Sequence, residues 1–193
     1  MAKTQPTHFG FGGEGTKPSL ENYKNKYGVD GAIISAVDLL KGIGILSGLS
    51  VIEVEGATGN YDTNFSGKAQ ACIDALKKGK NFVYLHMEAP DECGHHGDAE
   101  NKIYSIEQID QKVVTPIVDY LENCGEDYAV LICPDHPTPL SLKTHVSDPV
   151  PFIIYKKGDK DGNGATAYTE KQASQTGLIY SDGISMIKQF FNK

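Results

Sequence analysis

Arginine is absent from this sequence, and all 18 of its basic residues are lysines. The planar guanidinium of arginine is the usual clamp for phosphates and carboxylates, so any handling of phosphate here would depend on lysine, a metal ion or another chain. The 25 acidic residues outnumber the basic ones and give a formal net charge of −7. Because basic clusters supply most of the affinity for nucleic acids, this balance argues against a nucleic-acid-binding surface.

Long apolar runs are also missing. No stretch approaches the ~20 apolar residues that a membrane-spanning helix needs, and residues 1–6 lack the apolar core of a secretory signal. The four cysteines form no CxxC pair, so we expect reduced and mostly buried thiols. The composition, 39% apolar and 22% charged, is that of an ordinary globular domain. We therefore expect a cytoplasmic protein that contacts neither membranes nor nucleic acid.

The chain divides into an irregular N-terminal segment, residues 1–30, and a region of alternating strands and helices that begins at residue 31. The N-terminal segment predicts at most a short helix near residues 20–27. Apolar runs predict strands at 32–37, 51–54, 82–85, 128–133 and 151–155. Helices are expected at 39–49, 67–78 and 183–191, and an apolar stripe predicts a long amphipathic helix through Ile103, Ile106, Ile109, Val113, Ile117 and Leu121. This alternation indicates a single α/β domain over residues 1–193, with a largely parallel sheet flanked by helices.

Polar side chains gather directly after the third expected strand. The positions from Asp91 to Asp98 hold five carboxylates and histidines within eight residues. Ligands of parallel sheets bind in the loops at the carboxyl ends of the strands, so this is where a site is expected. Asp91 and His95 are four residues apart, and we expect Gly94 to supply unusual backbone angles in a loop that brings them together. Taken alone, such a pair is more typical of a turn with a solvated acid and a structural histidine.

Two further segments carry the same kinds of side chain. Asp135 and His136 follow the fourth strand and are held between prolines, and His145 lies shortly before the fifth strand. The pair alone is a turn signal. Three segments that present carboxylate oxygens and imidazole nitrogens at one edge of a sheet together favour a zinc or manganese site over an all-oxygen calcium site.

Two other motif matches are weaker. Residues 10–15 fit the glycine pattern GxGxxG, but no strand precedes them, so a flexible loop is the better interpretation. Residues 159–164 with Glu170 fit a calcium-loop pattern. A strand rather than a helix enters that loop, which favours a simple strand-to-helix connection.

At these residues the sequence resembles the archaeal type of cofactor-independent phosphoglycerate mutase, in the alkaline phosphatase superfamily. The resembling stretches are residues 31–44, 56–64, 86–98, 135–139 and 144–152. The resemblance implies two divalent metal ions, usually manganese or zinc, on either side of a serine nucleophile. It also implies that Asp91, His95 and His145 bind one ion, that Asp135 and His136 belong to the other, and that Lys41 contacts the phosphoryl group of a small phosphorylated substrate. Lys41 could equally be a solvated helix lysine.

The sequence departs from that family in one respect. The family's nucleophilic serine, a further aspartate ligand and an inserted substrate domain lie in an N-terminal half, and this chain is expected to begin after them. The resemblance then implies an incomplete alkaline-phosphatase-like fold, a second metal site that is incomplete, and no catalytic serine within the chain. We expect the missing half to be its partner, and an exposed sheet edge to favour self-association.

Three functions remain open at this point. The first is the interconversion of 3-phosphoglycerate and 2-phosphoglycerate in glycolysis by metal-dependent phosphoryl transfer, with the chain inactive on its own. The second is a phosphatase or another phosphotransferase of the same superfamily, because the metal ions transfer phosphoryl groups generally and substrate choice resides elsewhere. The third is a metal-binding module without catalytic activity.

Overall fold

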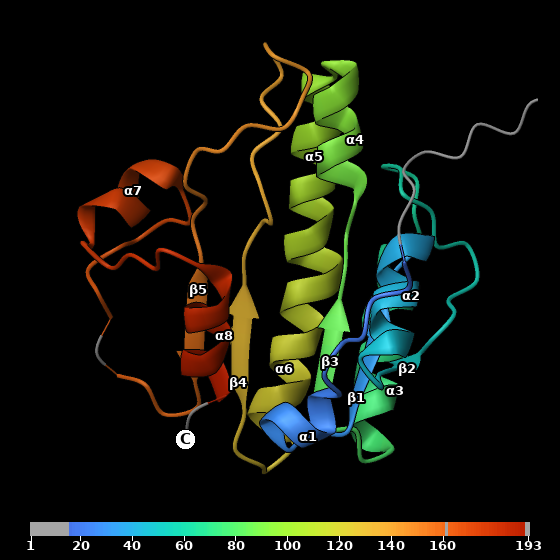
Figure 1. Cartoon of the computed structure of the whole chain (residues 1–193). Helices are drawn as coiled ribbons and strands as arrows, with labels where there is room; N and C mark the ends of the chain where they lie inside the picture. The colour runs from blue at the N-terminus through green and yellow to red at the C-terminus, as the bar shows by residue number, and fades with distance from the viewer. Residues whose placement is uncertain (1–15, 161, 192–193) are drawn as a thin grey trace, which may run out of the picture.

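The computed structural model describes residues 16–160 and 162–191 (Figure 1). The glycine motif at 10–15 and one position of the calcium-like loop, Asp161, lie outside the described residues. Within the N-terminal segment the structure has one short helix, α1 (Tyr23–Tyr27), near the place where the sequence predicts one.

A parallel sheet of three strands forms the centre of the fold. Its strands are β1 (Gly31–Ile34), β2 (Ser50–Val51) and β3 (Phe82–Leu85), in the order β2-β1-β3. β1 is buried along its whole length, as its unbroken apolar sequence requires. The connecting helices α2 (Asp38–Leu46) and α3 (Phe65–Lys77) pack on these strands. The prediction of an α/β fold with parallel strands flanked by helices is therefore confirmed.

The last two strands form a sheet of their own. β4 (Ala129–Ile132) and β5 (Ile153–Lys156) are antiparallel, with Ala129 opposite Lys156 and Ile132 opposite Ile153. Parallel pairing requires a crossover connection, usually a helix. The segment between these strands instead contains Pro134, Pro137, Pro139, Pro149 and Pro151 and forms no helix. The chain therefore returns in the opposite direction.

The long amphipathic helix is confirmed as one helical run, but its predicted stripe is wrong in its first half. The run consists of α5 (Ala99–Ile109), the π-helical turn η1 (Asp110–Val114) and α6 (Thr115–Asn123). Ile103 is 60% exposed and Ile106 53% exposed, whereas Ser105 and Gln108 are buried. A π turn inserts an extra residue and so rotates the helix before it relative to the helix after it. Of the predicted stripe, Ile109, Val113 and Ile117 pack in the core cluster.

One cluster of the hydrophobic core lies beneath the carboxyl end of β3. It comprises Phe65, Ala69, Ala89 and Val113, with Leu85, Met87, Ile109 and Ile117 packed around them. Ala89 is 1% exposed and is the first residue of α4 (Ala89–His96), the helix that follows β3. The core therefore fixes the start of α4. Two further helices, α7 (Glu170–Gln175) and α8 (Gly183–Phe191), complete the described fold, and no helix in the described part of the chain is long and apolar enough to cross a membrane.

The cysteines are free thiols, as expected, but only two of the four are buried, so the expectation of mostly buried thiols holds for half of them. Cys72 and Cys93 are buried, Cys124 is half-buried and Cys133 is exposed. Burial raises the pKa of the Cys72 thiol to about 11, so this cysteine is a thiol at neutral pH and behaves as a small core residue.

Candidate metal centre

The predicted site residues lie at the carboxyl ends of β3 and β4. In Figure 1 both strands point the same way, and α4 and the irregular chain after β4 continue from their tips. The expectation of a loop at 91–98 is wrong, because residues 89–96 form α4. Pro90 suits the first turn of a helix, and Gly97, with φ of 72°, ends it.

Gly94 serves close packing rather than an unusual backbone angle. It lies inside α4, and a Cβ added there would lie 2.5 Å from the carbonyl oxygen of Thr138 and 2.8 Å from Nζ of Lys102. Only a residue without a side chain allows α4 to approach the 133–152 segment this closely. The prediction that Gly94 belongs to the site is therefore correct, but the physical reason given for it is wrong.

Asp91, His95 and His145 converge on one point. On α4 the four-residue spacing puts Oδ2 of Asp91 3.2 Å from Nε2 of His95. Nε2 of His145 lies 2.9 Å from Nε2 of His95 and 3.4 Å from Oδ1 of Asp91. Ligands of a tetrahedral ion with bonds of about 2.0–2.1 Å stand about 3.3 Å from one another. The distances that join the two histidine nitrogens to each other and to the two oxygens of Asp91 are therefore close to the spacing that a small divalent cation requires.

A backbone carbonyl fixes the tautomer of His95. Nδ1 of His95 lies 3.0 Å from the carbonyl oxygen of Lys143. Because a carbonyl can only accept, the proton of a neutral imidazole is on Nδ1 and the lone pair is on Nε2, which faces His145 and Asp91. Histidines that bind metals typically donate their other nitrogen in this way. Lys143 has φ of 55°, a conformation that non-glycine residues seldom adopt and that tends to occur at functional sites.

Asp91 supplies negative charge to this point. Burial raises the pKa of its carboxyl group, but the hydrogen bond from Thr138 and the neighbouring His95, His145 and His136 lower it more, so the net pKa is below its ordinary value. Asp91 is therefore an ionised carboxylate at neutral pH. One anion beside nitrogen donors is a set that zinc and manganese both accept.

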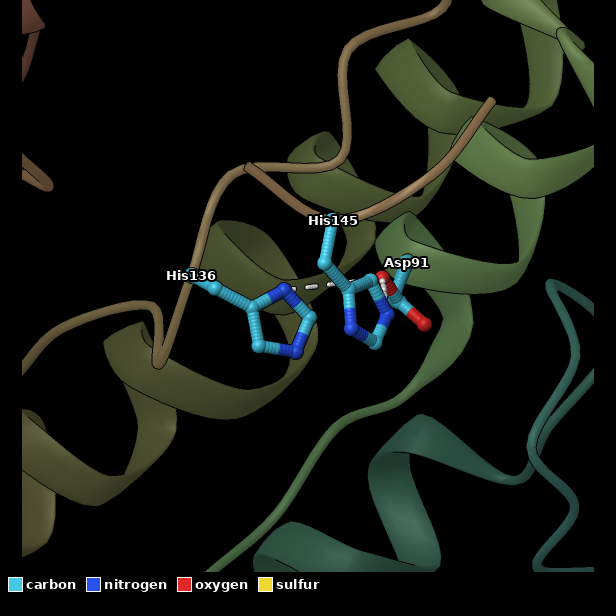
Figure 2. A group of neighbouring side chains, drawn as sticks. All are labelled: Asp91, His136 and His145. Carbon is cyan, nitrogen blue, oxygen red and sulfur yellow. Dashed lines mark ion pairs between the residues drawn. The ribbon is translucent and has the colours of Figure 1, made fainter. Parts of the chain in front are cut away.

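Asp135 and His136 lie beside the same cluster. The ring of His136 stacks on that of His145 with centroids 3.7 Å apart, and the ligand atoms of Asp91, His136 and His145 all lie within 4.8 Å of one another (Figure 2). Oδ2 of Asp135 lies 3.3 Å from Nε2 of His136. The structure thus brings together all five side chains for which the sequence predicts metal binding.

Three residues of this region were not predicted from the sequence: Glu88, Glu92 and Thr138. The carboxylates of Glu88 and Glu92 lie within 4.8 Å of each other and of Asp91, and the carboxylate of Glu88 also lies 3.4 Å from Nε2 of His86. Burial raises the pKa of Glu88. Thr138, which is buried, donates a hydrogen bond to Oδ1 of Asp91. Helical spacing from Asp91 could have indicated Glu88, but the role of Thr138 depends on a contact between distant segments.

Lys41 has carboxylate partners in this structure. On α2 its Nζ lies 2.9 Å from Oε2 of Glu53 and 3.6 Å from Oδ1 of Asp38. The hydrogen bond to Glu53 raises the pKa of Lys41, so its side chain is an ammonium ion at neutral pH. Its predicted contact with a phosphoryl group stays a prediction.

The chain is similar to known metalloenzymes. Residues 4–187 match the family described as the metalloenzyme superfamily. A probable 2,3-bisphosphoglycerate-independent phosphoglycerate mutase of Geobacter sulfurreducens is 45% identical over 94% of this chain and 45% of its own length. The 2,3-bisphosphoglycerate-independent phosphoglycerate mutase of Methanosarcina acetivorans is 49% identical over 91% of this chain and, again, 45% of its own length.

Two solved structures share the fold. A protein from Pyrococcus horikoshii superposes with a TM-score of 0.72 at 32% identity, over 80% of this chain and 46% of that one. A cofactor-independent phosphoglycerate mutase from Thermoplasma acidophilum has a TM-score of 0.59 at 20% identity, over 91% of this chain and 40% of that one. These matches confirm the resemblance seen in the sequence. The chain spans just under half the length of the relatives that it matches.

Proposed function

The chain belongs to the metalloenzyme superfamily, and from that premise we propose that it carries the metal-binding part of a phosphoglycerate mutase. The reaction would be the interconversion of 3-phosphoglycerate and 2-phosphoglycerate, a step of glycolysis in the cytoplasm. One observation carries the proposal: Asp91, His95 and His145 meet with donor atoms 2.9–3.4 Å apart. The names of the relatives from Geobacter and Methanosarcina support the choice of substrate.

We propose that these residues hold two divalent cations, manganese or zinc. Asp91, His95 and His145 would hold the first. Asp135 and His136 would hold the second. Two ligands are too few for a tight site, so we propose that the part of the relatives that this chain does not cover supplies others. Cations held there would lower the pKa of an attacking hydroxyl and stabilise charge on the phosphoryl oxygens.

This chain's own residues prepare the site. The carbonyl of Lys143 keeps Nε2 of His95 unprotonated, and Asp91 stays ionised because its neighbours lower its pKa. We further propose that the nucleophilic serine lies in the part of the relatives that this chain does not cover. Lys41 would contact the phosphoryl group. The phosphate must then compete with the Glu53 carboxylate for the ammonium group of Lys41. The chain alone would then be inactive.

A chimaera tests this function. The matching segment of the Methanosarcina acetivorans mutase is replaced by this chain, and mutase activity is measured with 3-phosphoglycerate and manganese. We expect the chimaera to be active and this chain alone to be inactive, because phosphoryl transfer needs both the cations and the nucleophile.

The matched control is the same chimaera with Asp91→Asn, which we expect to be inactive while remaining folded. Activity of the isolated chain would contradict the proposed need for further residues. A folded, metal-loaded chimaera that hydrolyses other phosphate esters but not phosphoglycerate would favour the phosphatase alternative. A chain that binds metal while its chimaera transfers no phosphoryl group would favour the non-catalytic module.

The sheet edges support a second proposal, self-association of the isolated chain. Within the described residues, β2, β3, β4 and β5 each pair with one strand only. Unpaired backbone groups along an edge recruit other strands. We expect light scattering to give a mass above that of one chain, increasing with concentration. A monomer at every concentration would show that these edges are protected.

A further inference from the structure

Thr138 lies where three parts of the site meet. Thr138 is 5% exposed, and its hydroxyl donates a hydrogen bond to Oδ1 of Asp91 on α4. Its carbonyl oxygen accepts a hydrogen bond of 2.9 Å from Nζ of Lys102 on α5. Gly94 lets the helix backbone approach that carbonyl. The residue is therefore fixed by its backbone as well as by its side chain.

The hydroxyl of Thr138 also faces the second histidine of the cluster. Oγ1 lies 3.4 Å from Nδ1 of His136. A threonine hydroxyl has one proton and two acceptor lone pairs, and an ionised carboxylate can only accept. The proton is therefore committed to Asp91, which leaves only lone pairs of Oγ1 toward His136.

Nε2 of His136 lies 3.3 Å from Oδ2 of Asp135. A carboxylate can only accept, so this contact does not depend on Thr138. The contact that defines the role of Thr138 is therefore its hydrogen bond to Oδ1 of Asp91.

We propose that Thr138 is a positioning residue of the metal centre: its hydroxyl, held in place by the contact of its backbone with Lys102, orients the Asp91 carboxylate. The inference rests on the proposed metal centre and names a residue that acts on it without touching the cations. Groups that orient metal ligands typically contribute 10–100-fold to metal affinity. Without the hydroxyl, Oδ1 of the half-buried Asp91 would also lose a hydrogen-bond partner.

The test compares two variants of the full chain. Thr138→Val keeps the shape of the side chain but removes the hydroxyl, and Thr138→Ser keeps the hydroxyl but removes the methyl group. Zinc affinity is measured by competition with a chelator, and circular dichroism of the metal-free proteins reports folding. We expect Thr138→Val to bind zinc about 10–100-fold more weakly and Thr138→Ser to bind it within about threefold of the unmodified chain.

Two results would overturn the proposal. One is unchanged zinc affinity of Thr138→Val. The other is an equal loss in both variants, which would assign the effect to altered packing at this buried position, because Thr138→Ser keeps the hydroxyl.

The proposed function fails in a different way. If the unmodified chain binds neither zinc nor manganese, the metal centre itself is wrong and the role of Thr138 is wrong with it. If the unmodified chain binds zinc and Thr138→Val binds it equally well, only the inference about Thr138 is overturned.

Discussion

Replacing Asp91 with asparagine is expected to weaken zinc or manganese binding by roughly 100-fold or more. Structural zinc sites with four ligands contribute about 10–16 kcal/mol, so one ligand accounts for about 3 kcal/mol, which corresponds to that factor. Asp91 is the one anion of the Asp91, His95 and His145 set, and its oxygens lie 3.2 and 3.4 Å from the two imidazole nitrogens. An amide is neutral and binds cations more weakly. Competition with a chelator, together with elemental analysis of the purified chain, measures the loss.

Asp119→Asn is the matched control for this substitution. Asp119 is exposed on α6, and the same chemical change there should leave metal affinity unaltered. If Asp91→Asn binds metal as tightly as the control, the cluster on α4 does not bind the cation, and the metal centre must be sought elsewhere in the chain.

Phe65→Ala is expected to lower the free energy of unfolding by about 3–5 kcal/mol. Phe65 is 4% exposed and is the first residue of α3. It packs in the core cluster with Ala69, Ala89 and Val113. Removing its ring leaves a cavity beneath Ala89, where α4 begins, so α4 and the site lose support together. Urea denaturation of the metal-free chain measures the change.

Tyr61→Ala provides the comparison for Phe65→Ala. Tyr61 is 45% exposed, so losing its ring should change the free energy of unfolding by no more than about 0.5 kcal/mol. Equal losses in the two variants would mean that the core does not lie at the Phe65 cluster. A large loss for Phe65→Ala alone would agree with the packing of that cluster.

Much of the fold could be predicted because its signals are local. The strand at 82–85 could be predicted to the residue, since four consecutive apolar residues bounded by polar ones leave little choice. Four of the five metal-binding candidates could be identified for a related reason: Asp91, His95, Asp135 and His136 follow apolar strands, at the edge of a sheet where sites form. Neither inference requires knowledge of which segments touch.

The features that could not be predicted leave no clear local signal in the sequence. The sequence favours a loop near Gly94 because glycine disfavours helices, yet Gly94 is needed for contact with Thr138, which lies in a different part of the chain. The stripe through Ile103 and Ile106 fails because a single π turn changes the phase of the helix. The antiparallel direction of β5 depends on a connection without a helix, and the regular alternation upstream hides it.

The described strands form two separate sheets, and the cluster of metal-binding candidates connects them. Asp91 and His95 follow β3 of the parallel sheet, whereas His136 and His145 lie between β4 and β5 of the antiparallel one. Thr138 joins the same two parts through Asp91 and Lys102. A cation shared by these side chains would fasten the sheets across a seam that no backbone ladder crosses within residues 16–160 and 162–191. Removal of the cation by a chelator would weaken the connection between the two sheets and leave the hydrogen bonds within each sheet intact.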